Sequence, residues 1–327
     1  MRLPKFEYFE AKTIQEACHA LKESGEKARL MGGGTDLLVS MKQRITTPAV
    51  VIGLKMIPGM DTILYDSEKG LRIGALATLD EIERSSLVQT NSPMLIQAAG
   101  RVASPALRRM GTLGGNLCLD SRCLYYNQSH FWRKSLDICL KRGGGSCHVV
   151  RGGKRCYAVY SGDLAPALIA MEAKVRLLDE NQERVIPVED LFSGDGKSPL
   201  TIGPHQILTE VIIPPTHQGD GKFLKYRLRD SIDFPLVNVA VFVKKAKNGG
   251  SESGRIVVGG IDSAPLRMKQ AEEILKVGRL EEGLINRVTE SVLKQVHPVD
   301  NTGGSPTLRR RMVPVLVRDA LLEIQKN

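Results

Sequence analysis

The sequence is poor in the features that would mark a disulfide scaffold or a membrane protein. Six cysteines among 327 residues are too few to build a fold on disulfides. No uninterrupted apolar run of about 18 residues occurs, and the start, MRLPKFEYFEAKT, lacks the apolar stretch of a secretory signal. We therefore expect a cytoplasmic globular protein with no membrane partner. With 42% hydrophobic and 25% charged residues, the chain can bury a sizeable core in two or three domains.

Positive charge is concentrated in one segment of the chain. The formal net charge is +10, and residues 101–156 contain eleven Arg or Lys against two Asp, which leaves +9 there. A basic segment with interleaved aromatics suits nucleic acid, an anionic cofactor, an acidic partner or an iron–sulfur cluster with anionic ligands. Because no helix-turn-helix, zinc-finger or RNP pattern accompanies the charge, we do not expect a nucleic-acid partner.

The order of strand and helix patterns predicts a mixed α+β chain. A strand is expected at 6–11, and Thr13 with Glu16 forms a capping-box pattern that opens a helix ended by Gly25. Cys18 lies on the apolar face of that helix, where it packs as a small apolar residue. Short β-rich runs follow, and 79–88 and 94–103 are expected to be helices. The tract 214–222, dense in proline, glycine and polar residues, is the clearest boundary, and strands and then helices come after it, with a loop at 247–254.

Two glycine-rich stretches, GGGTDLL at 32–38 and GTLGGNL at 111–117, are candidates for ligand-binding loops. Glycines after a strand let the backbone approach a ligand and expose successive N–H groups, which suits a pyrophosphate. The first stretch is neither a G-x-G-x-x-G fingerprint nor a P-loop, and alone it fits a tight turn equally well. Two such loops flanking one sheet-rich segment favour a shared dinucleotide-like ligand.

Four of the six cysteines fall in one short segment: Cys123, Cys139, Cys147 and Cys156. Their C-x15-C-x7-C-x8-C spacing matches neither the C-x2-4-C pairs of zinc fingers nor the tighter runs of bacterial ferredoxins, so spacing alone leaves Zn²⁺ and [4Fe–4S] both open. Nearby Arg and Lys favour the thiolate form that a ligand needs. Cys118, His130 and His148 are competing ligands, and a group of free surface thiols is the remaining reading.

Six motifs occur in order along essentially the whole chain: RLMGGGTDLL, IGALATL, VASPALRRMGTLGGNL, SGDLAPALIAM, KYRLRDSIDFPLVNVAV and RRRMVPVLVRDAL. Together they resemble the FAD-binding medium subunit of the molybdenum hydroxylase family, which includes xanthine dehydrogenase and carbon monoxide dehydrogenase. The resemblance implies an α+β fold: a two-subdomain FAD-binding (PCMH-type) domain and a CO-dehydrogenase-flavoprotein-like C-terminal α+β domain. The expected limits are 1–55 and 56–216 for the two FAD-binding subdomains and 217–327 for the C-terminal domain.

The segment between GTLGGN and SGDLAPAL is about forty residues longer than in most of that family. This insertion, at about 119–158, resembles the loop of the 4-hydroxybenzoyl-CoA reductase β subunit that carries an additional [4Fe–4S] cluster. The resemblance makes Cys123, Cys139, Cys147 and Cys156 its ligands, leaves Cys118 outside on the flavin-side motif, and gives the basic residues an anionic cluster to face. RLRDSIDFPLV is also particularly close to that subunit.

The resemblance also implies the flavin contacts. The first loop would wrap the FAD pyrophosphate, Thr78 would lie near the flavin, and a second cradle would come from the other loop. Asp163 would hydrogen-bond the cofactor from the start of its helix, and Lys225 would reach the pyrimidine side of the isoalloxazine, where a cation stabilises charge near N1 of the reduced ring. The full set is Leu30, Met31, Gly32, Gly33, Gly34, Thr35, Asp36, Leu37, Thr78, Val102, Ala103, Thr112, Gly115, Asn116, Asp163 and Lys225.

The function implied is electron transfer by one subunit of a larger oxidoreductase, with no catalytic residue for substrate chemistry on this chain. The expected partners are a small subunit with two [2Fe–2S] clusters and a large molybdopterin subunit, in a dimer of heterotrimers. Ferredoxin would supply electrons through [4Fe–4S] and FAD to [2Fe–2S] and molybdenum, where the phenolic hydroxyl of 4-hydroxybenzoyl-CoA is removed. The alternatives are a partner acting on another aromatic CoA ester, a purine or an aldehyde; a zinc-stabilised nucleic-acid-binding protein; and a flavoenzyme that uses pyridine nucleotide directly.

Overall fold

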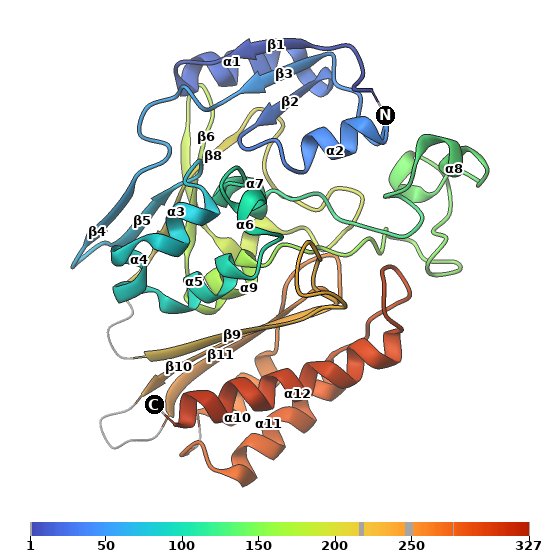
Figure 1. The fold of residues 1–327 in the computed structure, drawn as a ribbon. Helices are drawn as coiled ribbons and strands as arrows, with labels where there is room; N and C mark the ends of the chain where they lie inside the picture. The colour runs from blue at the N-terminus through green and yellow to red at the C-terminus, as the bar shows by residue number, and fades with distance from the viewer. Residues whose placement is uncertain (1, 216–218, 246–250, 277, 327) are drawn as a thin grey trace.

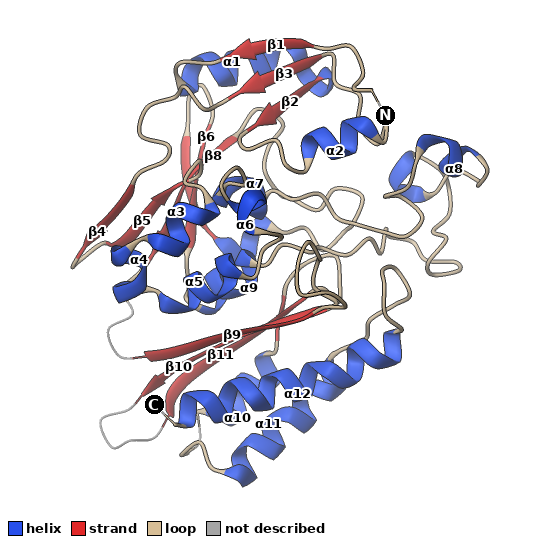
Figure 2. Ribbon diagram, viewed as in Figure 1, coloured by secondary structure: helices blue, strands red, loops and turns tan. Residues whose placement is uncertain are grey.

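The computed structural model describes residues 2–215, 219–245, 251–276 and 278–326, and three sheets organise them (Figures 1 and 2). The first sheet is parallel in the order β1-β3-β2. Its strands are β1 (Glu7–Glu10), β2 (Ala28–Met31) and β3 (Val50–Gly53), with α1 (Ile14–Ser24) after β1 and α2 (Leu37–Lys42) after β2. Within the described residues, no helix is both long and apolar enough to cross a membrane.

Helix α1 begins as predicted but with half of the expected capping box. Thr13 Oγ1 accepts a hydrogen bond from Glu16 N at 3.1 Å, whereas the Glu16 carboxylate accepts from Lys12 N, one residue before the cap. Gly25 ends the helix with a positive φ of 53°. The prediction for Cys18 is confirmed, because its side chain is fully buried in the core.

The second sheet is antiparallel in the order β4-β5-β8-β6-β7 and lies below the first in Figure 1. Its strands are β4 (Ile63–Asp66), β5 (Gly70–Gly74), β6 (Lys174–Leu178), β7 (Glu183–Pro187) and β8 (Ile207–Ile213). Its helices are α3 (Leu79–Arg84), α4 (Ser86–Asn91), α5 (Pro93–Gly100), α6 (Pro105–Arg108), α7 (Leu113–Leu117) and α9 (Leu164–Ala170). The single helix expected at 79–88 is wrong: it breaks at Ser85, whose side chain caps α4 through Val88 N.

Residues 119–158 form a lobe of mostly irregular chain that contains α8 (His130–Lys134), seen at the right of Figure 1.

The third sheet is antiparallel, in the order β12-β11-β10-β9. It comprises β9 (Gly219–Tyr226), β10 (Val237–Lys245), β11 (Ser251–Gly259) and β12 (Leu266–Arg267). The predicted loop at 247–254 is therefore shorter, since β11 begins at Ser251; residues 246–250 lie outside the described part.

Strand β10 is buried on both faces, and this fixes how the third sheet meets the second. Val237, Val239, Val241 and Val243 face a core with α10 (Lys269–Leu275), α11 (Glu282–Gln295) and α12 (Pro306–Gln325). The alternate residues Ala240 and Phe242 join the main core instead, where α9 contacts β10 and β11. Because successive side chains of a strand point to opposite faces, Asn238 is also directed toward α9.

Candidate functional site

Both glycine loops line one cavity of about 740 Å³, a size within the range of about 300–1,000 Å³ typical of cofactor pockets. Its wall includes most of the residues expected to hold a dinucleotide: Leu30, Met31, Gly32, Gly33, Gly34, Thr35, Asp36, Leu37, Val102, Ala103, Thr112, Gly115, Asn116 and Asp163. Among the described residues, Thr78 and Lys225 are expected contacts that do not line it.

Gly33 allows the two loops to pack on each other, and Gly115 allows the second loop to form its own turn. A Cβ on Gly33 would lie 1.7 Å from the carbonyl oxygen of Met110, and one on Gly115 would lie 2.9 Å from Thr112 Oγ1. Gly34 has a φ of 72°, which L side chains rarely adopt. The second loop opens α7, where Thr112 Oγ1 accepts from Gly115 N at 3.1 Å. The sequence suggested that these glycines let the backbone approach a ligand. At Gly33 the structure shows instead that the backbone approaches the backbone of Met110.

Thr78 lies behind the cavity and not in its wall. Its hydroxyl and backbone form a full capping box with Glu81 at the start of α3. A β-bridge joins Thr78 to Thr112, so Thr78 supports the second loop. Its direct contact with a flavin stays a prediction.

Lys225 of β9 forms a buried ion pair with Asp163, the residue before α9. Lys225 Nζ is 2.6 Å from Asp163 Oδ2 and also donates to the carbonyls of Arg101 and Asp233, so its three protons have three acceptors. Its side chain is 1% exposed. Asn238 Nδ2 donates to the other carboxylate oxygen at 2.9 Å. The pair therefore connects α9 to the third sheet, and contact of Lys225 with a flavin stays a prediction.

Four cations outside the expected set of contacts also line the cavity: Arg29, Arg122, Lys141 and Lys197. Arg122 lies 3.2 Å from Asp36 Oδ1 and stacks over the Phe234 ring at 4.2 Å. Burial raises the pKa of Asp36, while Arg122 opposes that shift. These cations suit the negative charge of a pyrophosphate, and the local charge of +9 was the only signal of Arg122 and Lys141 in the sequence.

Two non-glycine residues with positive φ meet at the cavity. Ala103 has a φ of 44° and Ile232 a φ of 51°, the latter an unfavourable conformation for a β-branched residue. Ile232 N donates to the Ala103 carbonyl at 3.0 Å, which joins the segment between β9 and β10 to the segment after α5. The periodicity of side chains does not predict such strained backbone conformations, which are frequent at ligand-binding sites.

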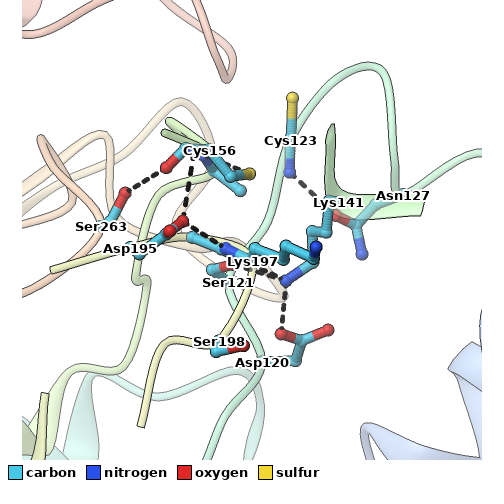
Figure 3. Close-up of polar contacts among 12 residues, drawn as sticks. Asp120, Ser121, Cys123, Asn127, Lys141, Cys156, Asp195, Lys197, Ser198 and Ser263 are labelled. Carbon is cyan, nitrogen blue, oxygen red and sulfur yellow. Dashed lines mark hydrogen bonds and ion pairs between the residues drawn. The ribbon is translucent and has the colours of Figure 1, made fainter. Parts of the chain in front are cut away.

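The four cysteines of the lobe line a second, smaller cavity together with His148. Burial raises the pKa of Cys123 to about 11 and also raises that of Cys156, so burial outweighs the basic residues expected to favour the thiolates. Figure 3 shows both cysteines tied by their backbone, Cys123 N to Asn127 Oδ1 and Cys156 N to Asp195 Oδ1. Cys118 lines the larger cavity instead, and His130 is exposed.

Several basic residues of the lobe have partners within the protein. Arg133 donates to the carbonyls of Gln43, Arg44 and Gln128, which ties the lobe to the chain after α2. Arg155 pairs with Asp262. The sequence analysis expected the basic residues of this segment to face an anionic cluster. Arg133 and Arg155 instead hold the lobe against the rest of the chain.

Comparison with known proteins agrees with this geometry. Residues 4–216 match the family model described as FAD binding domain in molybdopterin dehydrogenase, and 222–324 match the CO dehydrogenase flavoprotein C-terminal domain. The aldehyde oxidoreductase FAD-binding subunit PaoB of Escherichia coli is 30% identical, over 88% of this chain and 90% of its own. The nicotine 6-hydroxylase medium subunit of Paenarthrobacter nicotinovorans is 28% identical, over 99% of this chain and 98% of its own.

The fold has counterparts among solved structures. Carbon monoxide dehydrogenase from Hydrogenophaga pseudoflava superposes with a TM-score of 0.82 at 22% identity, over 100% of this chain and 99% of that one. The predicted α+β architecture, an FAD-binding domain followed by a CO-dehydrogenase-flavoprotein-like domain, is thereby confirmed. The chain belongs to the family of FAD-binding subunits of molybdenum-containing oxidoreductases, in which the flavoprotein is one subunit of a larger enzyme.

Proposed function

We propose that this chain carries both FAD and a [4Fe–4S] cluster and passes electrons between them within 4-hydroxybenzoyl-CoA reductase. The observation that supports this most is the convergence of Cys123, Cys139, Cys147 and Cys156 on one small cavity beside the flavin cavity. These residues come from separate turns of the lobe, and a group of free surface thiols has no reason to converge. Two of the four, Cys139 and Cys156, are buried.

The choice of a cluster over a single zinc ion rests on the resemblance of the inserted loop to that of the 4-hydroxybenzoyl-CoA reductase β subunit. All four cysteines line one cavity, while among the described residues no group of three or more Cys, His, Asp or Glu side chains is placed to hold a metal ion. A Zn²⁺ site needs its sulfurs about 2.3 Å from a single centre, whereas a [4Fe–4S] cluster is held by four thiolates around a larger body. When bound, the cluster would supply one-electron chemistry, and the cysteines would hold it.

The larger cavity fits the FAD of the family. The loops after β2 and before α7 would hold the pyrophosphate, with Arg29, Arg122 and Lys197 facing its charge. When bound, FAD would supply electron-exchange chemistry, and the residues of the cavity wall would hold and orient it. We propose that a small [2Fe–2S] subunit and a large molybdopterin subunit complete a dimer of heterotrimers, and that ferredoxin is the electron donor.

A second candidate is a related molybdenum hydroxylase acting on another aromatic CoA ester, a purine or an aldehyde. The similarity to subunits named for nicotine 6-hydroxylase and aldehyde oxidoreductase favours it, because these relatives match nearly the whole chain. The flavin site is common to both candidates, and the substrate pocket belongs to another chain.

The test is cofactor analysis of the complex purified without oxygen, followed by assay. About eight iron per heterotrimer, four for the proposed cluster and four for the two [2Fe–2S] clusters, and one FAD, with reduction of 4-hydroxybenzoyl-CoA by reduced ferredoxin, support the proposal. Only about four iron per heterotrimer, with or without one zinc, would refute the cluster, because the two [2Fe–2S] clusters account for that iron. Iron and FAD without turnover of that thioester, but with oxidation of an aldehyde or purine, would establish the second candidate. Rapid flavin reduction by NADH would instead identify a flavoenzyme that uses pyridine nucleotide directly.

A further inference from the structure

The two cavities share a wall. Among the described residues, Tyr126 and Lys141 are the two that line both the cysteine cavity and the larger cavity. Neighbouring side chains face one side only: Tyr125 and His148 line the cysteine cavity, and Arg122 lines the larger one.

The wall is rigidly held. Lys141 Nζ lies 4.9 Å from the centroid of the Tyr126 ring, close enough for a cation–π contact. The ammonium also donates to Asp120 Oδ1 at 2.7 Å and Ser121 Oγ at 2.8 Å, as Figure 3 shows. The Lys141 side chain is 4% exposed.

Tyr126 is tied to the cysteine side by its backbone, because its N–H donates to the carbonyl of Cys123 at 3.0 Å. Asp120, the ion-pair partner of Lys141, lines the larger cavity. Tyr126 is thus held on the side of the cysteine cavity and Lys141 on the side of the larger cavity. The two side chains meet in a cation–π contact and stand between the cavities.

We propose that the Tyr126 ring is the electron path between the two cofactor sites and that Lys141 is a positioning residue whose charge raises their reduction potentials. The proposal rests on the proposed function, because it needs both cofactors. Each crossing moves one electron: the group held by the cysteines is oxidised, the flavin is reduced, and no bond in the wall forms or breaks. A low-potential one-electron carrier replaces the electron.

An aromatic ring carries the path because electron transfer slows steeply when packed atoms are replaced by a gap. Tyr126→Leu opens such a gap, whereas Tyr126→Phe keeps the ring and removes only the hydroxyl. Phe131→Leu is the matched control, since Phe131 lies on the same lobe, is 88% exposed and lines neither cavity. Removing the Lys141 cation favours the oxidised states, because a nearby positive charge stabilises the added electron.

The experiment uses the anaerobically purified complex and begins with iron and flavin content. Each variant is mixed with titanium(III) citrate, and cluster reduction by EPR and flavin reduction by absorbance are followed together; Cys147→Ser gives the rate of direct flavin reduction. We expect Tyr126→Leu to slow cluster-dependent flavin reduction several-fold at full cofactor occupancy, with Tyr126→Phe and Phe131→Leu near wild type. An unchanged rate in Tyr126→Leu overturns the path.

A second measurement keeps the proposal testable if Tyr126→Leu loses a cofactor. Redox titration of Lys141→Met should give lower midpoint potentials for cluster and flavin, and Lys141→Arg should restore them. Potentials unchanged in Lys141→Met overturn the role of Lys141. Only about four iron per heterotrimer in the wild-type complex, the amount that the two [2Fe–2S] clusters hold, would instead refute the proposed function itself, so the two failures are distinguishable.

Discussion

At the scale of single residues, Gly33 shows that a glycine loop can be required for packing before any ligand binds. A Cβ there meets the Met110 carbonyl, so Gly33→Ala should destabilise the ligand-free chain by about 1–3 kcal/mol or more as well as lower its flavin content. Urea unfolding of the flavin-free protein measures the first effect. Gly145→Ala is the control, because a Cβ there meets nothing within 4 Å. Lost flavin with unchanged stability would mean that Gly33 faces only the ligand.

Tyr160 is a core residue behind the second glycine loop that sequence reasoning missed. Its buried hydroxyl donates to the carbonyls of Asn116 and Leu117 at 3.0 and 3.2 Å. Tyr160→Phe leaves these acceptors without that donor, and we expect a loss of about 1–3 kcal/mol at pH 7. Burial raises the pKa of Tyr160 well above its ordinary value of 10.0.

The raised pKa also predicts how the effect of Tyr160→Phe depends on pH. The unfolded chain loses the phenolic proton first as pH rises, so the contribution of Tyr160 is complete below about pH 10 and decreases above it. The stability difference between wild type and Tyr160→Phe should therefore narrow above pH 10 in urea titrations. A stability difference that stays constant above pH 10 would show that Tyr160 has the same pKa in the folded and the unfolded chain.

Single cysteines test the separation of the two cavities. Cys147→Ser should lower the iron content of the complex by about four per heterotrimer while FAD remains, because Cys147 lines only the smaller cavity. Cys118→Ser is the matched control. A complex with this change should keep the iron content of the wild type, since Cys118 lines the larger cavity. Iron and flavin are measured on the same anaerobic samples. Loss of both cofactors in Cys147→Ser would show that the lobe supports the flavin loops structurally.

At the scale of elements, the Lys225–Asp163 pair connects β9 to the start of α9. Removing one partner of a buried ion pair leaves an uncompensated charge, so Lys225→Met should cost about 3–5 kcal/mol. The double change Lys225→Met with Asp163→Asn should recover part of this loss, because no buried charge then remains. Lys222→Met, on the same strand at a half-buried pair with Glu323, should cost much less. Equal losses for both lysines in urea unfolding would contradict this role.

Elements were predictable from sequence where a local pattern determines them. The apolar face of α1 and the short strand runs follow from patterns of neighbouring residues. The tract 214–222 overlaps the third sheet, because β9 already begins at Gly219, and residues 216–218 lie outside the described part. The break at Ser85, the meeting of Ala103 with Ile232 and the partners of Lys225 depend on residues far away in the chain. A single sequence does not show such partners, so the cavity wall was largely predictable while the polar contacts behind it were not.

At the scale of the whole molecule, the larger cavity is built by segments connected to all three sheets: the loop after β2, the segments around α6, α7 and α9, and residues 232–234 between β9 and β10. A ligand that contacts them all stabilises their joint arrangement by mass action, by about 2.7 kcal/mol at a hundredfold excess over Kd. Removing FAD should therefore lower the unfolding temperature of the whole chain, and added FAD should restore it in proportion to the logarithm of its concentration. Calorimetry at several FAD concentrations measures this. Gly33→Ala should show little shift, because its loops no longer close the cavity. An FAD-dependent shift confined to one of two separate transitions would show that the third sheet folds independently of the flavin site.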